Sequence, residues 1–122
     1  MTRVMIVDDS EESRLLLKDF LLEHNHNVVA EAGDGIEALE KYDSEKPELI
    51  FLDLIMPKLD GLSVLKKIRL YDPTSKIIVI TGDDSIEIFE ECTRLGAIAF
   101  LTKPIDLNDV LSAISFSNEI II

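Results

Sequence analysis

The chain has 122 residues, of which 47% are hydrophobic and 30% are charged, and its 24 acidic and 12 basic side chains give a net charge of −12. This length and composition predict one globular domain, residues 1–122, that needs neither disulfides nor a structural metal to bury a core. The acidic excess argues against direct nucleic-acid binding, because phosphate backbones are bound mainly by clusters of Lys and Arg. We therefore expect protein partners.

The single cysteine, Cys92, cannot form an internal disulfide, which favours a reducing compartment. The sequence runs from Met1 directly into a strand-like segment, and no later apolar stretch is long enough to cross a bilayer. We expect a cytoplasmic protein with no membrane association.

Strand and helix signals alternate from the start of the chain. Residues 3–7 form the first apolar strand, and Ser10 is a suitable N-cap for the helix that follows. The stripe that this helix would bury consists of Leu16, Leu17, Phe20 and Leu21. A second strand is predicted at residues 28–32. The helix after it would bury Ile36, Leu39 and Tyr42.

The alternation continues to the last helix. Strands are predicted at residues 49–53, 76–81 and 99–102, as short runs of Ile, Val, Leu and Phe. Asp60 before Gly61 begins a helix with Leu62, Leu65 and Ile68 inward. In the next helix, Ile86, Phe89 and Thr93 compete with Ile88, Cys92 and Leu95 for the buried side. The last helix would bury Leu107, Val110, Leu111 and Ile114.

Five strands alternating with five helices over short connections predict an α/β fold, a doubly wound parallel sheet with helices on both faces. Such sheets bind ligands at the carboxyl ends of their strands. Four apolar runs end there on chemically active residues: Asp8 and Asp9, Asp53, Thr81, and Thr102 with Lys103. This edge of the sheet is therefore the expected reaction centre.

Three carboxylates at neighbouring strand ends, those of Asp8, Asp9 and Asp53, would repel one another. A hard divalent cation with oxygen ligands, usually Mg²⁺, relieves that repulsion. A simpler alternative is that acids here only cap helices, with Asp9 or Ser10 capping the first one. That alternative does not account for Asp53, which ends an apolar strand, or for Lys103.

A metal-bound carboxylate flanked by a hydroxyl and an ammonium suits phosphoryl transfer. The metal and the lysine would neutralise the phosphoryl oxygens, the hydroxyl would hydrogen-bond one of them, and a carboxylate oxygen would attack in line. Asp53 is the best candidate nucleophile because it stands alone at the end of the central strand.

Taken together, the motifs resemble those of the receiver domains of two-component response regulators, over essentially the whole chain. In this sequence they read Val7-Asp8-Asp9-Ser10, Leu52-Asp53-Leu54-Ile55-Met56-Pro57 with Asp60-Gly61, Ile80-Thr81-Gly82, and Thr102-Lys103-Pro104. The resemblance implies a flavodoxin-like five-stranded sheet in the order 2-1-3-4-5. It also implies a switch that catalyses its own phosphorylation and dephosphorylation, rather than a turnover enzyme.

The resemblance also implies roles for the acids. Asp53 would accept the phosphoryl group and contribute to the Mg²⁺ site. Asp9 would bind Mg²⁺ directly and Asp8 largely through water, with the backbone carbonyl of Ile55 as a further ligand.

Other family positions carry over in the same way. Thr81 and Lys103 would contact the phosphoryl group, and the Lys103-Pro104 bond is expected to be cis. Gly61 is a structural position of its motif. Phe100 matches the switch aromatic, expected to swing inward as Thr81 moves toward the phosphate; its other interpretation is an ordinary core phenylalanine.

The implied partners are a sensor histidine kinase, which supplies the phosphoryl group, and a downstream protein or output domain. The fourth helix, fifth strand and fifth helix, about residues 85–117, would form the output face, and phosphorylation would shift it between two arrangements. Dimerisation through this face on phosphorylation is a further expectation, whereas direct nucleic-acid binding by this domain is not.

Three other functions stay open from sequence. An aspartate-nucleophile phosphatase of the haloacid dehalogenase type would carry a second aspartate two residues after the nucleophile, where this chain has Ile55. An interaction module could keep the fold without accepting phosphate. The third alternative is dinucleotide binding, because Gly33-Asp34-Gly35-Ile36-Glu37-Ala38 matches a glycine fingerprint, although its acids would repel a pyrophosphate.

Overall fold

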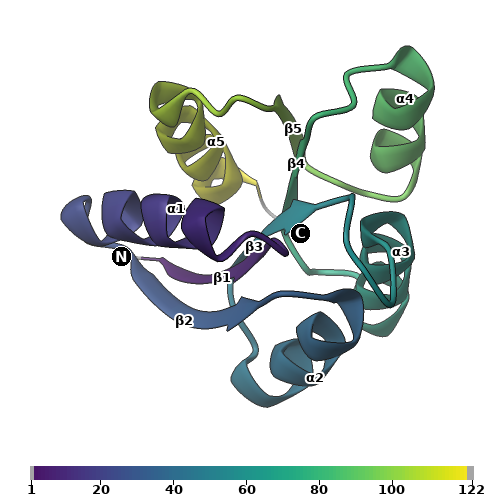
Figure 1. Cartoon of the computed structure of the whole chain (residues 1–122), viewed down its shortest axis with the longest axis horizontal. Coiled ribbons are helices and arrows are strands. Elements are labelled where there is room, and N and C mark those ends of the chain that lie inside the picture. Colours follow the sequence, from purple (N-terminus) through teal and green to yellow (C-terminus); the bar gives the residue numbers. More distant parts are fainter. Residues whose placement is uncertain (1, 121–122) are drawn as a thin grey trace.

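A five-stranded parallel sheet forms the centre of the computed structural model, which describes residues 2–120 (Figure 1). Its strands are β1 (Arg3–Val7), β2 (Asn27–Ala32), β3 (Leu49–Asp53), β4 (Ile77–Thr81) and β5 (Ala99–Thr102). They lie in the order β2-β1-β3-β4-β5, and every neighbouring pair is parallel. The flavodoxin-like order predicted from the sequence is confirmed.

Five helices cover the two faces of this sheet in the described part of the chain. They are α1 (Glu11–Glu23), α2 (Gly35–Glu45), α3 (Gly61–Tyr71), α4 (Ile86–Arg94) and α5 (Leu107–Glu119). Figure 1 shows α1 and α5 on one face, and α2, α3 and α4 on the other. Among the residues described, none of the helices has the length and apolar character required to span a bilayer.

The core is divided by the sheet into two apolar layers, and β3 contributes to both. Ile50 and Leu52 pack in the layer under α2, α3 and α4, whereas Leu49 and Phe51 pack in the layer under α1 and α5. Alternate residues of a strand point to opposite faces, so a strand covered on both sides must be apolar throughout. All of β3 is buried, including Asp53 at its end.

Every helix begins on a side chain that accepts a backbone N–H hydrogen bond from its first turn. These N-caps are Ser10, Asp34, Asp60, Ser85 and Asp106. An N-cap side chain satisfies a donor that has no partner within the helix. Two to seven residues separate each strand from the helix that follows it, so the helix starts lie near the carboxyl edge of the sheet.

Two of the predicted helical stripes are wrong in one position each. Leu16 is 63% exposed in α1, where Leu17 and Leu21 are buried, and Ile36 is 48% exposed in α2, where Ala38 and Tyr42 are buried. Successive residues point about 100° apart around a helix. In both helices the apolar residues cover a wider arc of the helix surface than the part that faces the sheet, so one apolar residue stays exposed.

Of the two apolar stripes that the sequence offers on α4, the structure buries the one that contains Ile88, Cys92 and Leu95. Cys92 is buried, with Ile88 and Leu95 packed on the same layer, whereas Ile86 and Phe89 are 70% and 50% exposed. The exposed stripe therefore leaves an apolar surface on α4.

Candidate functional site

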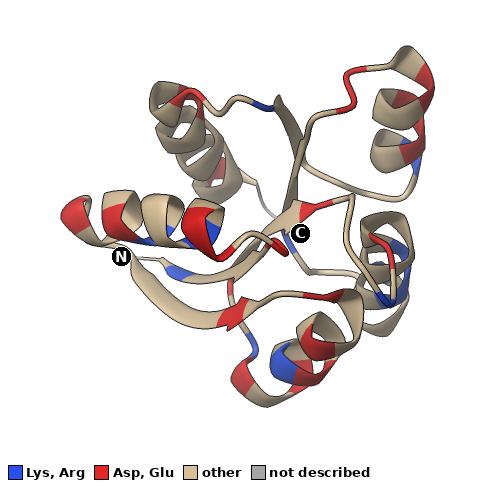
Figure 2. Cartoon of the chain, in the orientation of Figure 1, with Lys and Arg blue, Asp and Glu red and all other residues tan. Residues whose placement is uncertain are grey.

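Chemically active side chains meet at the carboxyl end of the sheet. Asp8 and Asp9 follow β1, and Asp53 ends β3, which is the neighbouring strand. One carboxylate oxygen from each of the three lies within 4.8 Å of the others. Figure 2 shows these acidic segments at the ends of β1 and β3. The parallel topology thus assembles a cluster with the oxygen donors that Mg²⁺ prefers.

Three of the strand ends turn in the same way. The backbone N–H of Ser10 donates to Asp8 Oδ1 at 2.9 Å, and that of Ile55 donates to Asp53 Oδ1 at 3.1 Å. At the end of β4, the N–H of Asp83 donates to Thr81 Oγ1 at 3.2 Å. A side chain that accepts from the second residue after it bends the chain sharply. For the two aspartates, this turn fixes one oxygen and leaves the second free to face the site.

The two remaining oxygens are joined by a lysine. Lys103 Nζ donates to Asp53 Oδ2 at 3.0 Å and to Asp8 Oδ2 at 3.1 Å. Its backbone N–H bonds the carbonyl of Thr81 at 2.8 Å, and the Lys103-Pro104 peptide is cis. Lys103 therefore links the ends of β1, β3 and β4.

Burial and ion pairing shift the pKa values of Asp53 and Lys103 in opposite directions. Asp53 is only 5% exposed, and burial raises the pKa of its carboxyl, although Lys103 and the Ile55 N–H pull it back. Burial alone would lower the pKa of Lys103, but hydrogen bonds and attraction from Asp53 and Asp8 outweigh it and raise that pKa above its usual value. The lysine is thus held as a cation between two carboxylates.

Asp9 differs from the other two acids because its side chain is exposed. Within residues 2–120 its carboxylate has no hydrogen bond or ion pair. The cap of α1 is Ser10, whose hydroxyl accepts from the Ser13 N–H at 3.2 Å. The helix-capping alternative therefore does not explain Asp9, whose oxygens stay available to a cation.

Thr81 ends β4 at the same edge, whereas Phe100 lies on the neighbouring strand β5, two positions before its end. Thr81 is fully buried, beside a cavity of about 140 Å³ that Ile55, Asp83 and Ile88 also line. On β5, Phe100 is half-buried and packs edge-to-face against Phe89, with 5.4 Å between ring centroids. The ring occupies the junction between β5 and α4.

Gly61 sits where the chain after Asp53 returns to begin α3. A Cβ at this position would overlap the carbonyl oxygen of Asp53 and the Cα of Leu54, which are both backbone atoms. The Gly61 N–H also donates to the Leu54 carbonyl at 2.9 Å. The close approach requires a residue without a side chain and holds the loop that carries Ile55 against the end of β3.

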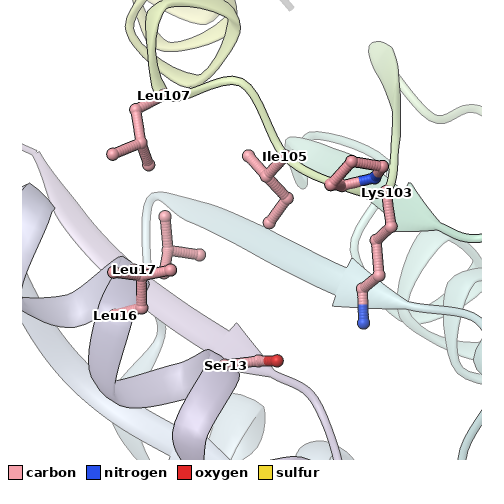
Figure 3. A pocket seen from close by; sticks show the side chains of 7 residues that line it. Ser13, Leu16, Leu17, Lys103, Ile105 and Leu107 are labelled. Carbon is pink, nitrogen blue, oxygen red and sulfur yellow. The ribbon is translucent and has the colours of Figure 1, made fainter.

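An apolar groove of about 220 Å³ adjoins the site between α1 and the loop before α5 (Figure 3). Leu16, Leu17, Ile105 and Leu107 supply its walls, together with Ser13 and Pro104, while Lys103 extends along its edge. The exposed Leu16 that the stripe prediction placed in the core lies here.

Arg14 contacts the acidic cluster, although sequence reasoning did not single it out. Its guanidinium Nη1 donates to the backbone carbonyl of Asp8 at 2.5 Å, and its Nε lies 3.4 Å from Glu31 Oε1. The available signal was a lone cation in a helical turn that otherwise carries Glu11 and Glu12, where the helix dipole favours acids.

The geometry agrees with a comparison against known families. The model of the response regulator receiver domain matches residues 4–115. This chain belongs to the response regulator receiver family. Receiver domains act in two-component signalling as phosphoacceptors rather than turnover enzymes, and they bind Mg²⁺ at an acidic pocket.

Individual receivers cover nearly the whole chain. The chemotaxis protein CheY of Bacillus subtilis is 36% identical over 113 residues, which are 93% of this chain and 94% of that protein. Sporulation initiation phosphotransferase F of the same bacterium is 29% identical over 112 residues, 92% of this chain and 90% of that protein. A chain in the crystal structure of the CheX-CheY-BeF3-Mg²⁺ complex from Borrelia burgdorferi superimposes with a TM-score of 0.92, at 31% identity, over 94% of this receiver and 87% of that chain.

The dinucleotide alternative does not fit the glycine segment of this receiver. Glu37 Oε1 accepts the Gly33 N–H at 2.7 Å, and Asp34 Oδ1 accepts the Glu37 N–H at 2.8 Å. Backbone donors that would bind a pyrophosphate are thus paired with carboxylates of the segment itself. Gly35 is explained by packing, because a Cβ there would overlap Leu59.

Proposed function

We propose that this receiver is a phosphorylation-controlled switch in which Asp53 accepts a phosphoryl group from the phosphohistidine of a sensor histidine kinase. The observation that carries the proposal is the arrangement of Asp53: it is buried at the end of the central strand, with one oxygen held by its own turn and the other paired with Lys103. A nucleophile held in one orientation favours in-line attack on phosphorus.

In the proposed reaction, a carboxylate oxygen of Asp53 bonds to phosphorus as the bond from phosphorus to the histidine nitrogen breaks, and the electron pair leaves with the imidazole. The ammonium of Lys103 and the hydroxyl of Thr81 would contact the phosphoryl oxygens and stabilise their charge. Hydrolysis of the acyl phosphate would return the receiver to its resting state, by autocatalysis at the same residues.

Asp8, Asp9 and Asp53 are proposed to hold Mg²⁺, with the backbone carbonyl of Ile55 as a further ligand. Three carboxylate donors lie within 4.8 Å of one another, and that of Asp9 is exposed and has no partner among residues 2–120, an arrangement that fits a hard cation keeping several waters. When bound, the ion neutralises negative charge on the phosphoryl group and on the acids.

We place the switch at Thr81 and Phe100. Open space of about 140 Å³ beside Thr81 and about 230 Å³ between Phe100 and α4 would accommodate a second packing of these side chains. Phosphorylation would shift α4, β5 and α5 toward that packing. Loss of the edge-to-face contact between Phe100 and Phe89 is the expected first change.

The proposed partners are a sensor histidine kinase in the cytoplasm and a downstream protein or output domain. The crystallised relative from Borrelia burgdorferi is in a complex with CheX, which shows that relative engaging a protein partner. The face of α4, β5 and α5 would serve this purpose here, or pair with a second phosphorylated copy. The net charge of −12 over the whole chain makes direct contact with nucleic acid unfavourable.

The decisive experiment is intact-mass analysis after incubation with acetyl phosphate, with and without Mg²⁺, on the wild type and Asp53→Asn. The proposal predicts a Mg²⁺-dependent gain of one phosphoryl group that is lost in the variant. Labelling that persists at another residue would overturn the role of Asp53. No labelling with acetyl phosphate or candidate kinases would favour a phosphate-independent interaction module, and release of free phosphate without an adduct would favour a phosphatase or a very short-lived acyl phosphate.

A further inference from the structure

Arg14 holds the peptide bond that joins two of the acids. Its Nη1 donates to the carbonyl oxygen of Asp8, with 2.5 Å between nitrogen and oxygen. This carbonyl belongs to the peptide unit between Asp8 and Asp9. The Nε of Arg14 faces Glu31 on the neighbouring strand β2. A planar guanidinium that bonds two groups at once has little rotational freedom, so it restrains the orientation of that peptide.

The restraint matters because the two acids are fixed to different degrees. Asp8 is held by its N–H, which donates to Ala32 at 3.0 Å, and by both carboxylate oxygens. Within residues 2–120, the Asp9 carboxylate is held by no side chain or backbone donor. Its position relative to Asp8 and Asp53 therefore depends on the backbone that carries it, and Arg14 bonds that backbone.

Neighbouring residues keep Arg14 in place. Its side chain is only 17% exposed, and Glu31 also pairs with Lys18 at 3.1 Å. Lys18 shares the partner of Arg14 without contacting Asp8, which makes it a matched control.

We propose that Arg14 is a positioning residue for Mg²⁺: by fixing the peptide between Asp8 and Asp9, it keeps the Asp9 carboxylate close enough to the other two acids to bind one cation with them. This inference rests on the Mg²⁺ site of the proposed function and adds a residue that acts on the ligands without touching the ion. Groups that orient metal ligands in this way commonly change affinity about tenfold or more when removed.

A purely electrostatic role for Arg14 predicts the opposite result. Removing a positive charge near three acids makes the local potential more negative, which would strengthen Mg²⁺ binding. Loss of the peptide restraint would weaken it. The sign of the change in affinity therefore separates the two roles.

The test is isothermal titration calorimetry of the full chain with MgCl2, on the wild type, Arg14→Ala and Lys18→Ala, at a temperature where all are folded by circular dichroism. We expect Arg14→Ala to weaken Mg²⁺ binding about tenfold, and Lys18→Ala to change it by less than about twofold. Unchanged or tighter binding in Arg14→Ala would overturn the inference, as would an equal loss in Lys18→Ala.

Arg14→Lys keeps the charge but cannot reproduce the fork that spans Asp8 and Glu31. If Arg14→Ala does not fold, a loss of about threefold or more in Arg14→Lys supports positioning, and an unchanged affinity rejects it. Absence of Mg²⁺ binding by the wild type would instead contradict the proposed metal site itself, so the two failures are distinguishable.

Discussion

Each carboxylate of the acidic cluster has its own surroundings. Asp53 and Asp8 are buried and share Lys103, whereas Asp9 is exposed and unpaired within the described residues. Burial disfavours the ionised form of Asp53 and is the main cause of the raised pKa of its carboxyl. Removing that charge should therefore affect stability as well as chemistry.

The first prediction concerns Asp53→Asn in metal-free protein. Because the pKa of Asp53 is higher in the folded than in the unfolded state, the wild type loses stability as pH rises through the interval between those two values. The amide carries no charge, so the variant should unfold at higher urea than the wild type at neutral pH. The difference should vanish at acidic pH, where the wild-type carboxyl is protonated in both states. A variant less stable at neutral pH would contradict the burial argument.

The second prediction is that Gly61→Ala destabilises the fold by about 2 kcal/mol or more, because the new methyl group would overlap backbone atoms that cannot move aside easily. Gly82→Ala is the matched control, since a Cβ at Gly82 has no atom within 4 Å. Urea unfolding of both variants, followed by circular dichroism, checks the difference. Equal stabilities would show that the β3-α3 connection relaxes freely.

Residues at strand ends were predictable from the sequence, whereas the residue that supports them was not. Asp8, Asp53 and Lys103 follow apolar runs, and parallel topology brings the ends of such runs together. The principal site contact of Arg14 is with a backbone carbonyl, and every residue offers one, so the sequence names no partner for it. Its place as a cation in an acidic first helical turn was the one signal, and that signal points to no particular site.

At the scale of the elements, strand boundaries and the helix starts at Ser10 and Asp60 were predicted better than buried faces. Strand limits follow from apolar runs and helix starts follow from Ser or Asp, which are local features. The exposure of Leu16 and Ile36 depends on how closely each helix approaches the sheet. That distance is set by tertiary packing. The sequence alone therefore could not predict which residue of a wide apolar stripe stays exposed.

The third prediction concerns the contact between α2 and the end of α3, where the Tyr42 hydroxyl donates to Asp72 Oδ2 at 2.5 Å. This hydrogen bond is the main cause that lowers the pKa of Asp72. Tyr42→Phe should cost about 1 kcal/mol of unfolding free energy at neutral pH. A carboxyl whose pKa is lower in the folded state stabilises the fold at pH values above its unfolded pKa. This stabilisation is lost as pH falls through the folded-state pKa, so the free-energy cost of Tyr42→Phe should shrink in acid.

Tyr71→Phe provides the control for that measurement. The Tyr71 hydroxyl also bonds a carboxylate, that of Asp43, at 2.9 Å, but Tyr71 is 62% exposed. Exposed pairs of this kind contribute little, so the variant should lie within about 0.5 kcal/mol of the wild type. Similar costs for both tyrosines, with no dependence on pH, would refute the role assigned to Asp72.

For the whole molecule, the net charge of −12 means that any salt raises stability by screening repulsion between acidic side chains. Specific Mg²⁺ binding must therefore be distinguished from this general effect. The fourth prediction is that millimolar Mg²⁺ raises the melting temperature by about 5 °C above NaCl of the same ionic strength. In Asp9→Asn most of that extra gain should disappear, because an exposed ligand is lost without disturbing the core. An undiminished gain in the variant, measured by differential scanning calorimetry, would place the ion elsewhere.

Because Lys103 pairs with both Asp8 and Asp53, the fold needs no metal ion to supply a positive charge beside these buried carboxylates. The chain brings its own internal counter-ion, so one of the two negative charges on the buried carboxylates is balanced within the fold itself. A divalent ion at the proposed site would enter a finished scaffold, beside an ammonium that is already tethered there. Under the proposed function, Mg²⁺ would thus bind and leave without the scaffold having to assemble or unfold.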